Sequence, residues 1–179
     1  NVGDRDLQEG IARVDTLARV YALPLVSASV LQADTKEPIF KPYVVKVIDG
    51  VRVGVIGVTP PEMFALAPES RTKGLTFAEV QESLRRWLPE VRKKADLVVL
   101  LGQLSEEEAL KLKETTPGID VIVRGVRDIE WGVKRNEAGG VARATRYGTG
   151  MGVLKVKASG GAVTGFEDRQ ITFAKGSMA

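Results

Sequence analysis

Helical and strand-like patterns of apolar residues alternate through the first 125 residues. Apolar residues recur at spacings of three and four over residues 7–21, which predicts an amphipathic helix that ends before Pro24. The same period predicts a longer helix over residues 77–94. Pro89 predicts a kink or break in it, because proline lacks the helical N–H donor. Short apolar runs predict buried strands over residues 25–30, 97–101 and 119–123.

The clearest hairpin signal covers residues 43–58. Two apolar arms flank Asp49-Gly50, a pair that tolerates the positive φ angles of a type I′ turn. The second arm, residues 51–58, is apolar at almost every position, so we expect it to be buried on both faces at the centre of a sheet. Ser105 followed by three glutamates predicts the start of a helix that ends at Pro117.

Beyond Gly125 the pattern changes to short β-like segments, which predict strands within residues 140–147, 151–158 and 162–173. The alternation before this point is typical of βαβ units, so the chain is predicted to be α/β with a β-rich C-terminal part. We expect a single domain over residues 1–175, while residues 176–179 have the composition of a tag or cloning remnant. No apolar run approaches the roughly 18 residues of a membrane span.

Composition excludes several kinds of chemistry. The 179 residues include no cysteine and no histidine, which removes disulfides, thiolate nucleophiles and the commonest ligand of transition metals. The net charge of +3 comes from 26 basic and 23 acidic residues scattered along the chain. A nucleic-acid partner is therefore not expected, because such binding requires clustered basic residues.

Two predicted strands, 97–101 and 119–123, run into loops at their carboxyl ends, the edge where α/β sheets assemble ligand sites. On this feature alone, ordinary connections to the next element are the simpler interpretation.

Motifs in these loops and elsewhere resemble the 5′-nucleotidase-type metallophosphoesterases. Gly3-Asp4-Arg5-Asp6-Leu7-Gln8-Glu9-Gly10 is similar to that family's Gly-Asn-His-Glu-Phe-Asp-x-Gly, and the strand that ends in Gly102-Gln103-Leu104 resembles one that ends in Leu-Ser-His-Leu. Three further stretches follow the family's order: residues 25–30, 117–128 and 144–154. The resemblance implies a metallophosphoesterase-like sandwich of two mixed β-sheets flanked by helices. It also implies that this domain is N-terminally incomplete, because the first family motifs would precede residue 1.

The resemblance also assigns the positions of the family's catalytic residues. The ligand asparagine falls at Asp4, the catalytic histidine at Arg5, and three ligand histidines at Gln103, Val126 and Asp128. The family uses two divalent ions, such as Mn, Zn or Mg, to clamp a phosphate and activate water. With these positions degenerate, we expect no catalytic residue, no metal and no cofactor.

The hypothesis from the sequence is a catalytically inactive domain that serves as a structural or interaction module. The first alternative is a phosphoester (nucleotide) hydrolase whose remaining metal ligands lie in a missing N-terminal segment or a partner chain. The second is an anion- or nucleotide-binding domain that uses Arg5 and Arg127, although pairing of these arginines with Asp4, Asp6 or Asp128 is favoured.

A sheet that lacks its first strands would also expose an edge. We therefore expect a protein partner or the missing N-terminal segment to complete it. The resemblance implies an extracytoplasmic, periplasmic location, although no signal peptide opens this chain.

Overall fold

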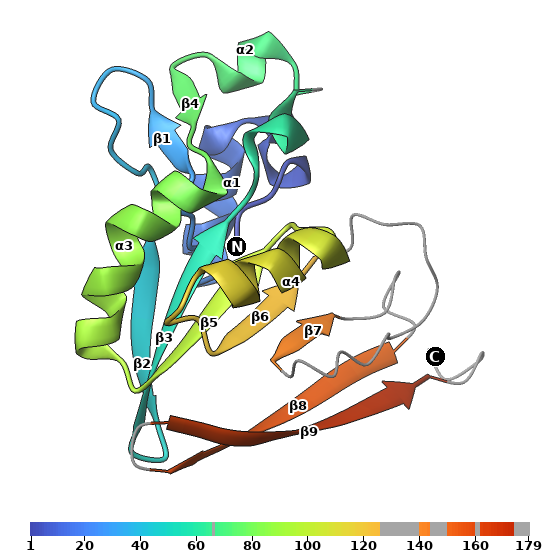
Figure 1. Ribbon diagram of the computed structural model, residues 1–179. Coiled ribbons are helices and arrows are strands. Elements are labelled where there is room, and N and C mark those ends of the chain that lie inside the picture. Colours follow the sequence, from blue (N-terminus) through green and yellow to red (C-terminus); the bar gives the residue numbers. More distant parts are fainter. Residues whose placement is uncertain (66, 126–139, 144–149, 160–161, 174–179) are drawn as a thin grey trace.

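The computed structural model describes residues 1–65, 67–125, 140–143, 150–159 and 162–173, and its centre is a five-stranded mixed sheet (Figure 1). The strand order is β2-β3-β5-β6-β7. These strands span Tyr43–Ile48, Val51–Val58, Leu97–Gly102, Val121–Arg124 and Val141–Arg143. Strand β2 is antiparallel to β3, and the remaining neighbours are parallel. The α/β class is confirmed.

Two antiparallel strand pairs accompany this sheet. One pair is β1 (Val30–Gln32) with β4 (Leu75–Phe77), and the other is β8 (Gly150–Ser159) with β9 (Ala162–Thr172). The longer helices are α1 (Ile11–Val20), α3 (Val80–Lys94) and α4 (Glu106–Thr115). Shorter turns of helix are η1 (Arg5–Glu9), η2 (Pro61–Phe64) and α2 (Glu69–Thr72). Of the predicted β-rich C-terminal part, residues 141–143 form β7 of the central sheet, and residues 150–159 and 162–172 form the β8–β9 hairpin. Residues 144–149 and 160–161 lie outside the described residues.

The main core lies between the central sheet and helices α3 and α4, which are the crossovers of two parallel strand connections. Ile56, Val98, Leu100 and Ile122 are fully buried on the sheet side. Leu84, Leu88 and Val91 face them from α3, so the helical stripe predicted from the sequence forms this core. A second cluster, which includes Leu7, Val14 and Phe64, packs the N-terminal helices against β1 and β4.

The hairpin prediction is confirmed in its turn and corrected in its burial. Asp49 and Gly50 have φ angles of 49° and 80°, as a type I′ turn requires. Strand β3 does lie between β2 and β5, but only its carboxyl half is buried, and Val51 and Arg52 are exposed near the turn. The apolar pattern of residues 51–58 therefore predicted more burial than the first residues of β3 have.

Three element predictions are wrong at their boundaries. The helix expected over residues 7–21 is divided at Gly10, whose φ of 82° separates η1 from α1. The helix expected from Phe77 begins at Val80, because Phe77 instead pairs with Val30 in the β1–β4 ladder. Residues 25–29 are buried for the most part, yet they form only one isolated bridge, between Val26 and Lys41.

The sequence predicts that Pro89 kinks or breaks its helix; α3 continues through it, so the break is wrong, while the kink stays a prediction. Leu88 and Val91 lie on either side of Pro89 and are almost completely buried in the core. The free energy gained by burying these two side chains offsets the loss of the backbone hydrogen bond that the proline cannot make. The start of α4 follows its sequence signal, because Ser105 and Glu108 form a reciprocal capping box.

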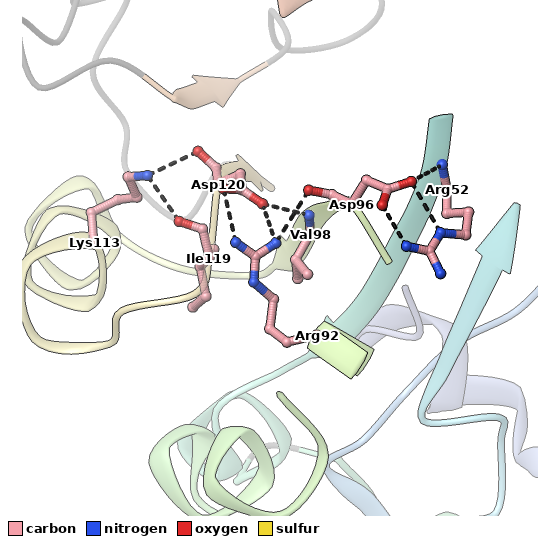
Figure 2. Close-up of polar contacts among 7 residues, drawn as sticks. All are labelled: Arg52, Arg92, Asp96, Val98, Lys113, Ile119 and Asp120. Atoms are coloured by element: carbon pink, nitrogen blue, oxygen red, sulfur yellow. Dashed lines mark hydrogen bonds and ion pairs between the residues drawn. The ribbon is translucent and has the colours of Figure 1, made fainter. Parts of the chain in front are cut away.

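Ion pairs fix the amino-terminal edge of the sheet (Figure 2). Arg92 donates to both carboxylate oxygens of Asp120, at 2.8 and 3.4 Å, and Asp120 also accepts the backbone N–H of Val98 at 2.7 Å. Nearby, the Arg52 guanidinium pairs with Asp96 and lowers the pKa of that carboxyl to about 2. The two pairs tie α3, β3, β5 and β6 together at this edge.

Among the described residues, no helix combines the length and the apolar character that crossing a bilayer requires.

Candidate functional site

A cavity of about 500 Å³ opens at the carboxyl ends of β5 and β6, at the opposite edge of the sheet from the ion pairs of Figure 2. The N-terminal segment, residues 1–6, forms one wall. The loops that follow the two strands form the other, with Gly102 and Gln103 after β5 and Arg124 and Gly125 at the end of β6. The sequence indicated this end of the strands as the place where α/β sheets assemble ligand sites, although ordinary connections were the simpler interpretation of the loops alone.

Two predicted site residues, Asp4 and Gln103, meet in this cavity although 99 positions separate them. The Gln103 side-chain amide donates to Asp4 Oδ1 at 2.8 Å, and the Asp4 backbone N–H donates to Gln103 Oε1 at 3.4 Å. Gly3 makes this approach possible, because a Cβ atom there would lie only 2.8 Å from Gln103 Oε1. The pair fastens the N-terminal segment to the end of β5.

Arg5 lies beside this pair on the wall of the cavity, and its side chain is exposed. It makes no hydrogen bond or ion pair with any residue that the structure describes, whereas Asp4 is bound to Gln103 and Asp6 accepts the backbone N–H of Gly3 at 2.8 Å. The expected pairing of Arg5 with Asp4 or Asp6 is therefore wrong.

The remaining predicted positions, Val126, Arg127 and Asp128, lie outside the described residues. Their placement relative to the cavity stays a prediction.

Arg124 is a lining residue that the motif comparison missed. Its side chain is only 2% exposed, and its guanidinium donates to Glu106 in the first turn of α4 at 3.0 Å. The signal in the sequence is a cation that directly follows the apolar run 119–123, because a charged residue is rarely buried without a partner. Arg124 therefore lines the cavity as a residue already paired with the carboxylate of Glu106.

The described residues around the cavity do not fit a pair of divalent ions. They contain no group of three or more histidine, cysteine, aspartate or glutamate side chains that could hold a metal ion. Asp4 Oδ1 accepts an amide N–H from Gln103 rather than facing open space, and the Arg5 guanidinium, without a partner among the described residues, lies on the same wall.

Comparison with known proteins identifies relatives over most of the chain. It is 30% identical over 144 residues to a 2′,3′-cyclic-nucleotide 2′-phosphodiesterase/3′-nucleotidase of Yersinia enterocolitica, a match covering 70% of this chain and 22% of that protein. The corresponding protein of Salmonella typhimurium is 27% identical over 145 residues, again 70% of this chain and 22% of the relative. The chain is related to the 5′-nucleotidase-type metallophosphoesterases.

Solved structures show the same fold. A 5′-nucleotidase precursor of Thermus thermophilus superposes with a TM-score of 0.78 at 24% identity, over 95% of this chain and 38% of that one. The sulfate thiohydrolase SoxB of the same species superposes with a TM-score of 0.81 at 23% identity, over 93% of this chain and 31% of that one. The calcineurin-like phosphoesterase YfkN of Bacillus subtilis gives 0.77 at 21% identity, over 95% and 62%. No profile of a protein family matches the chain.

The metallophosphoesterase relationship covers only part of the curated relatives, since the chain spans 22% of their length. Within this part the resemblance assigned ligand positions to Asp4 and Gln103, and both line the cavity. These two side chains bind each other, so this part of the family's site is closed by a hydrogen-bonded pair.

Proposed function

We propose that this chain is a catalytically inactive metallophosphoesterase-like domain that acts as a structural or interaction module. The observation that carries the proposal is the Asp4–Gln103 pair, in which the side chain at a ligand-histidine position donates an N–H to the side chain at the ligand-asparagine position. Two groups that shared a metal ion would both present lone pairs to it. Here the Gln103 amide N–H donates a hydrogen bond to Asp4 Oδ1, so the two side chains bind each other directly and not through an ion.

Charge and composition support the same proposal. The 179 residues contain no histidine, so no imidazole is available as a ligand or as a general base. Water bound to a catalytic metal ionises near pH ~7, compared with ~15.7 in bulk. Without the ion, the site loses this way of generating a hydroxide nucleophile.

Metal loading tests this proposal. After incubation with Mn²⁺, Zn²⁺ or Mg²⁺ and desalting, mass spectrometry should find no stoichiometric metal, and the chain should not hydrolyse p-nitrophenyl phosphate. EDTA should leave the melting temperature unchanged, because a hydrogen-bonded pair rather than an ion closes the site.

Stoichiometric metal that is lost in Asp4→Ala but kept in Asp15→Ala would overturn the proposal. It would support the first alternative, a nucleotide or other phosphoester hydrolase, which the activities of the curated relatives favour. Asp15 is a suitable control because it is an exposed carboxylate on α1, away from the cavity.

Anion binding is a second candidate function, and the position of the Arg5 guanidinium at the cavity, without a partner among the described residues, favours it. Phosphate, sulfate or AMP should then raise the melting temperature, and Arg5→Ala should abolish the increase. Arg13→Ala is the matched control, because Arg13 is an exposed arginine of α1 that does not line the cavity. An unchanged melting temperature with all three ligands would exclude this function.

For the whole protein we propose an extracytoplasmic, periplasmic location, supported by the resemblance to periplasmic nucleotidases. Fusing the natural full-length protein to alkaline phosphatase, which is active only after export, would test it.

A further inference from the structure

A second pocket, of about 280 Å³, lies between helix α3 and the β1–β4 strand pair (Figure 1). We name it the α3 pocket, and its lining residues lie within 28–36, 76–78 and 82–87. It shares no lining residue with the cavity at the carboxyl ends of β5 and β6. Small-molecule sites commonly have volumes of about 300–1,000 Å³, so this pocket favours a ligand no larger than a single amino acid.

Arg86 joins the two walls of the α3 pocket. Its guanidinium donates to both carboxylate oxygens of Glu37, at 2.7 and 2.8 Å, and to the Lys36 carbonyl at 3.2 Å. The same guanidinium lies over the Trp87 ring, 4.7 Å from its centroid. These contacts bind the turn after β1 to α3, and they leave the positive charge of Arg86 already paired.

The interior of the α3 pocket is mostly apolar. Ala28, Leu31 and Ala78 are buried, and the aromatic residues Phe77 and Trp87 add to the lining. Ser83 is buried as well, but its hydroxyl already donates to the Ala28 carbonyl at 3.3 Å. The interior therefore suits an apolar group rather than a polar one.

Two charged side chains of the lining have no partner among the described residues. They are Lys36, on the turn after β1, and Glu82, in the first turn of α3, and both residues are exposed. With Arg86 paired to Glu37, the pocket presents one available cation and one available anion from two different walls. A ligand with a single charge would match only one of them, whereas a zwitterion matches both.

The backbone of Lys36 indicates that its side chain is not there for the turn. Its φ of 58° lies in the left-handed region that favours glycine, so lysine is a strained choice at this position. The turn is closed by backbone bonds that any residue could make, from the Lys36 N–H to Gln32 O and from the Gln32 N–H to Glu37 O, both at 2.9 Å. Strain of this kind is typical of residues that hold a ligand.

We propose that the α3 pocket binds a free α-amino acid with an aliphatic side chain. Lys36 binds the carboxylate, Glu82 binds the ammonium group, and the side chain packs between Ala28, Leu31 and Trp87. A residue inside a peptide does not fit, because its amino and carboxyl groups are uncharged amides. This inference goes beyond the proposed function, since it concerns a different pocket and involves no metal.

The experiment titrates the whole chain with three ligands by isothermal calorimetry: L-leucine, leucinamide, which lacks the carboxylate, and N-acetyl-leucine, which lacks the ammonium group. We expect one leucine to bind per chain, and each derivative to bind about tenfold more weakly. Glu82→Gln should bind leucine no better than N-acetyl-leucine. Lys36→Gly should bind leucine no better than leucinamide, yet its melting temperature should not fall, because glycine relieves the strained φ.

The matched controls are Lys41→Gly and Glu69→Gln, the same changes at exposed residues that do not line the pocket, and both should bind leucine like the unsubstituted chain. Three results would overturn the proposal. One is no leucine binding, and another is equal binding of leucine and its two derivatives. The third is unchanged leucine binding in Lys36→Gly or Glu82→Gln. None of these results changes the metal assay, so this proposal and the proposed function fail separately.

Discussion

Asp120→Ala should lower the free energy of unfolding by about 2–3 kcal/mol, one of the two largest effects expected of a single substitution here. The Asp120 side chain is only 15% exposed and accepts three hydrogen bonds, two from Arg92 and one from the backbone N–H of Val98. Val98 is fully buried, so the alanine variant leaves its N–H without this acceptor as well as leaving Arg92 without its counterion. Urea denaturation monitored by circular dichroism measures the change.

The matched control for Asp120 is Asp15→Ala. Asp15 pairs with Arg19 one turn along α1 at 2.7 Å, but the two side chains are 55% and 74% exposed. Such a pair contributes at most about 0.5 kcal/mol. Equal losses in the two variants would show that the contacts of Figure 2 do not hold the strands together.

Gly54→Ala should destabilise the chain by a similar amount, about 2–3 kcal/mol, through overpacking. A Cβ atom on Gly54 would clash with Val91 Cγ1 and lie 3.0 Å from Ala95 Cβ. Val91 and Ala95 are buried at the end of α3, so the added methyl group can be accommodated only if the helix moves away from the sheet. The melting temperature and the urea midpoint should both fall.

Gly165→Ala controls for the loss of a glycine from a strand. The nearest atom to a Cβ there is Lys157 Cδ at 4.0 Å, an ordinary contact with a flexible side chain. Its stability should change by no more than about 0.5 kcal/mol. If Gly54→Ala were equally harmless, the close approach of α3 to β3 would not be a constraint on the sequence.

In the inactive domain that we propose, the fold persists while the chemistry of its site has changed. The family relationship and the superposition with solved phosphoesterases rest on the strands and helices, whose packing does not require a metal. In the described part of the site, a hydrogen bond between Gln103 and Asp4 joins the two walls. A direct hydrogen bond can replace part of the stabilisation that an ion bound between the two walls would give, because it satisfies polar atoms of both side chains.

The sequence by itself determined the elements whose signals are local. The Asp49-Gly50 turn needs only two residues that accept positive φ, the Ser105 capping box is complete within four residues, and the periods of α3 and β5 follow from their own side chains. These elements depend on short stretches of chain, so the local pattern is sufficient to predict them. The resemblance to a known family, rather than any local pattern, assigned Asp4 and Gln103 to one site, and a hydrogen bond joins their side chains in the structure.

The tertiary structure alone decided the features that depend on distant neighbours. Phe77 belongs to a strand because Val30 is beside it, α3 passes through Pro89 because the core holds both sides, and Arg124 is buried because Glu106 reaches it from the next helix. Strand β5 is a similar case: its apolar sequence indicates that it should be covered, but only the packing of other elements decides which of its faces is buried. Local propensity contributes tenths of a kcal/mol per residue. Burial of one large side chain contributes about 1.5–3 kcal/mol and therefore outweighs it.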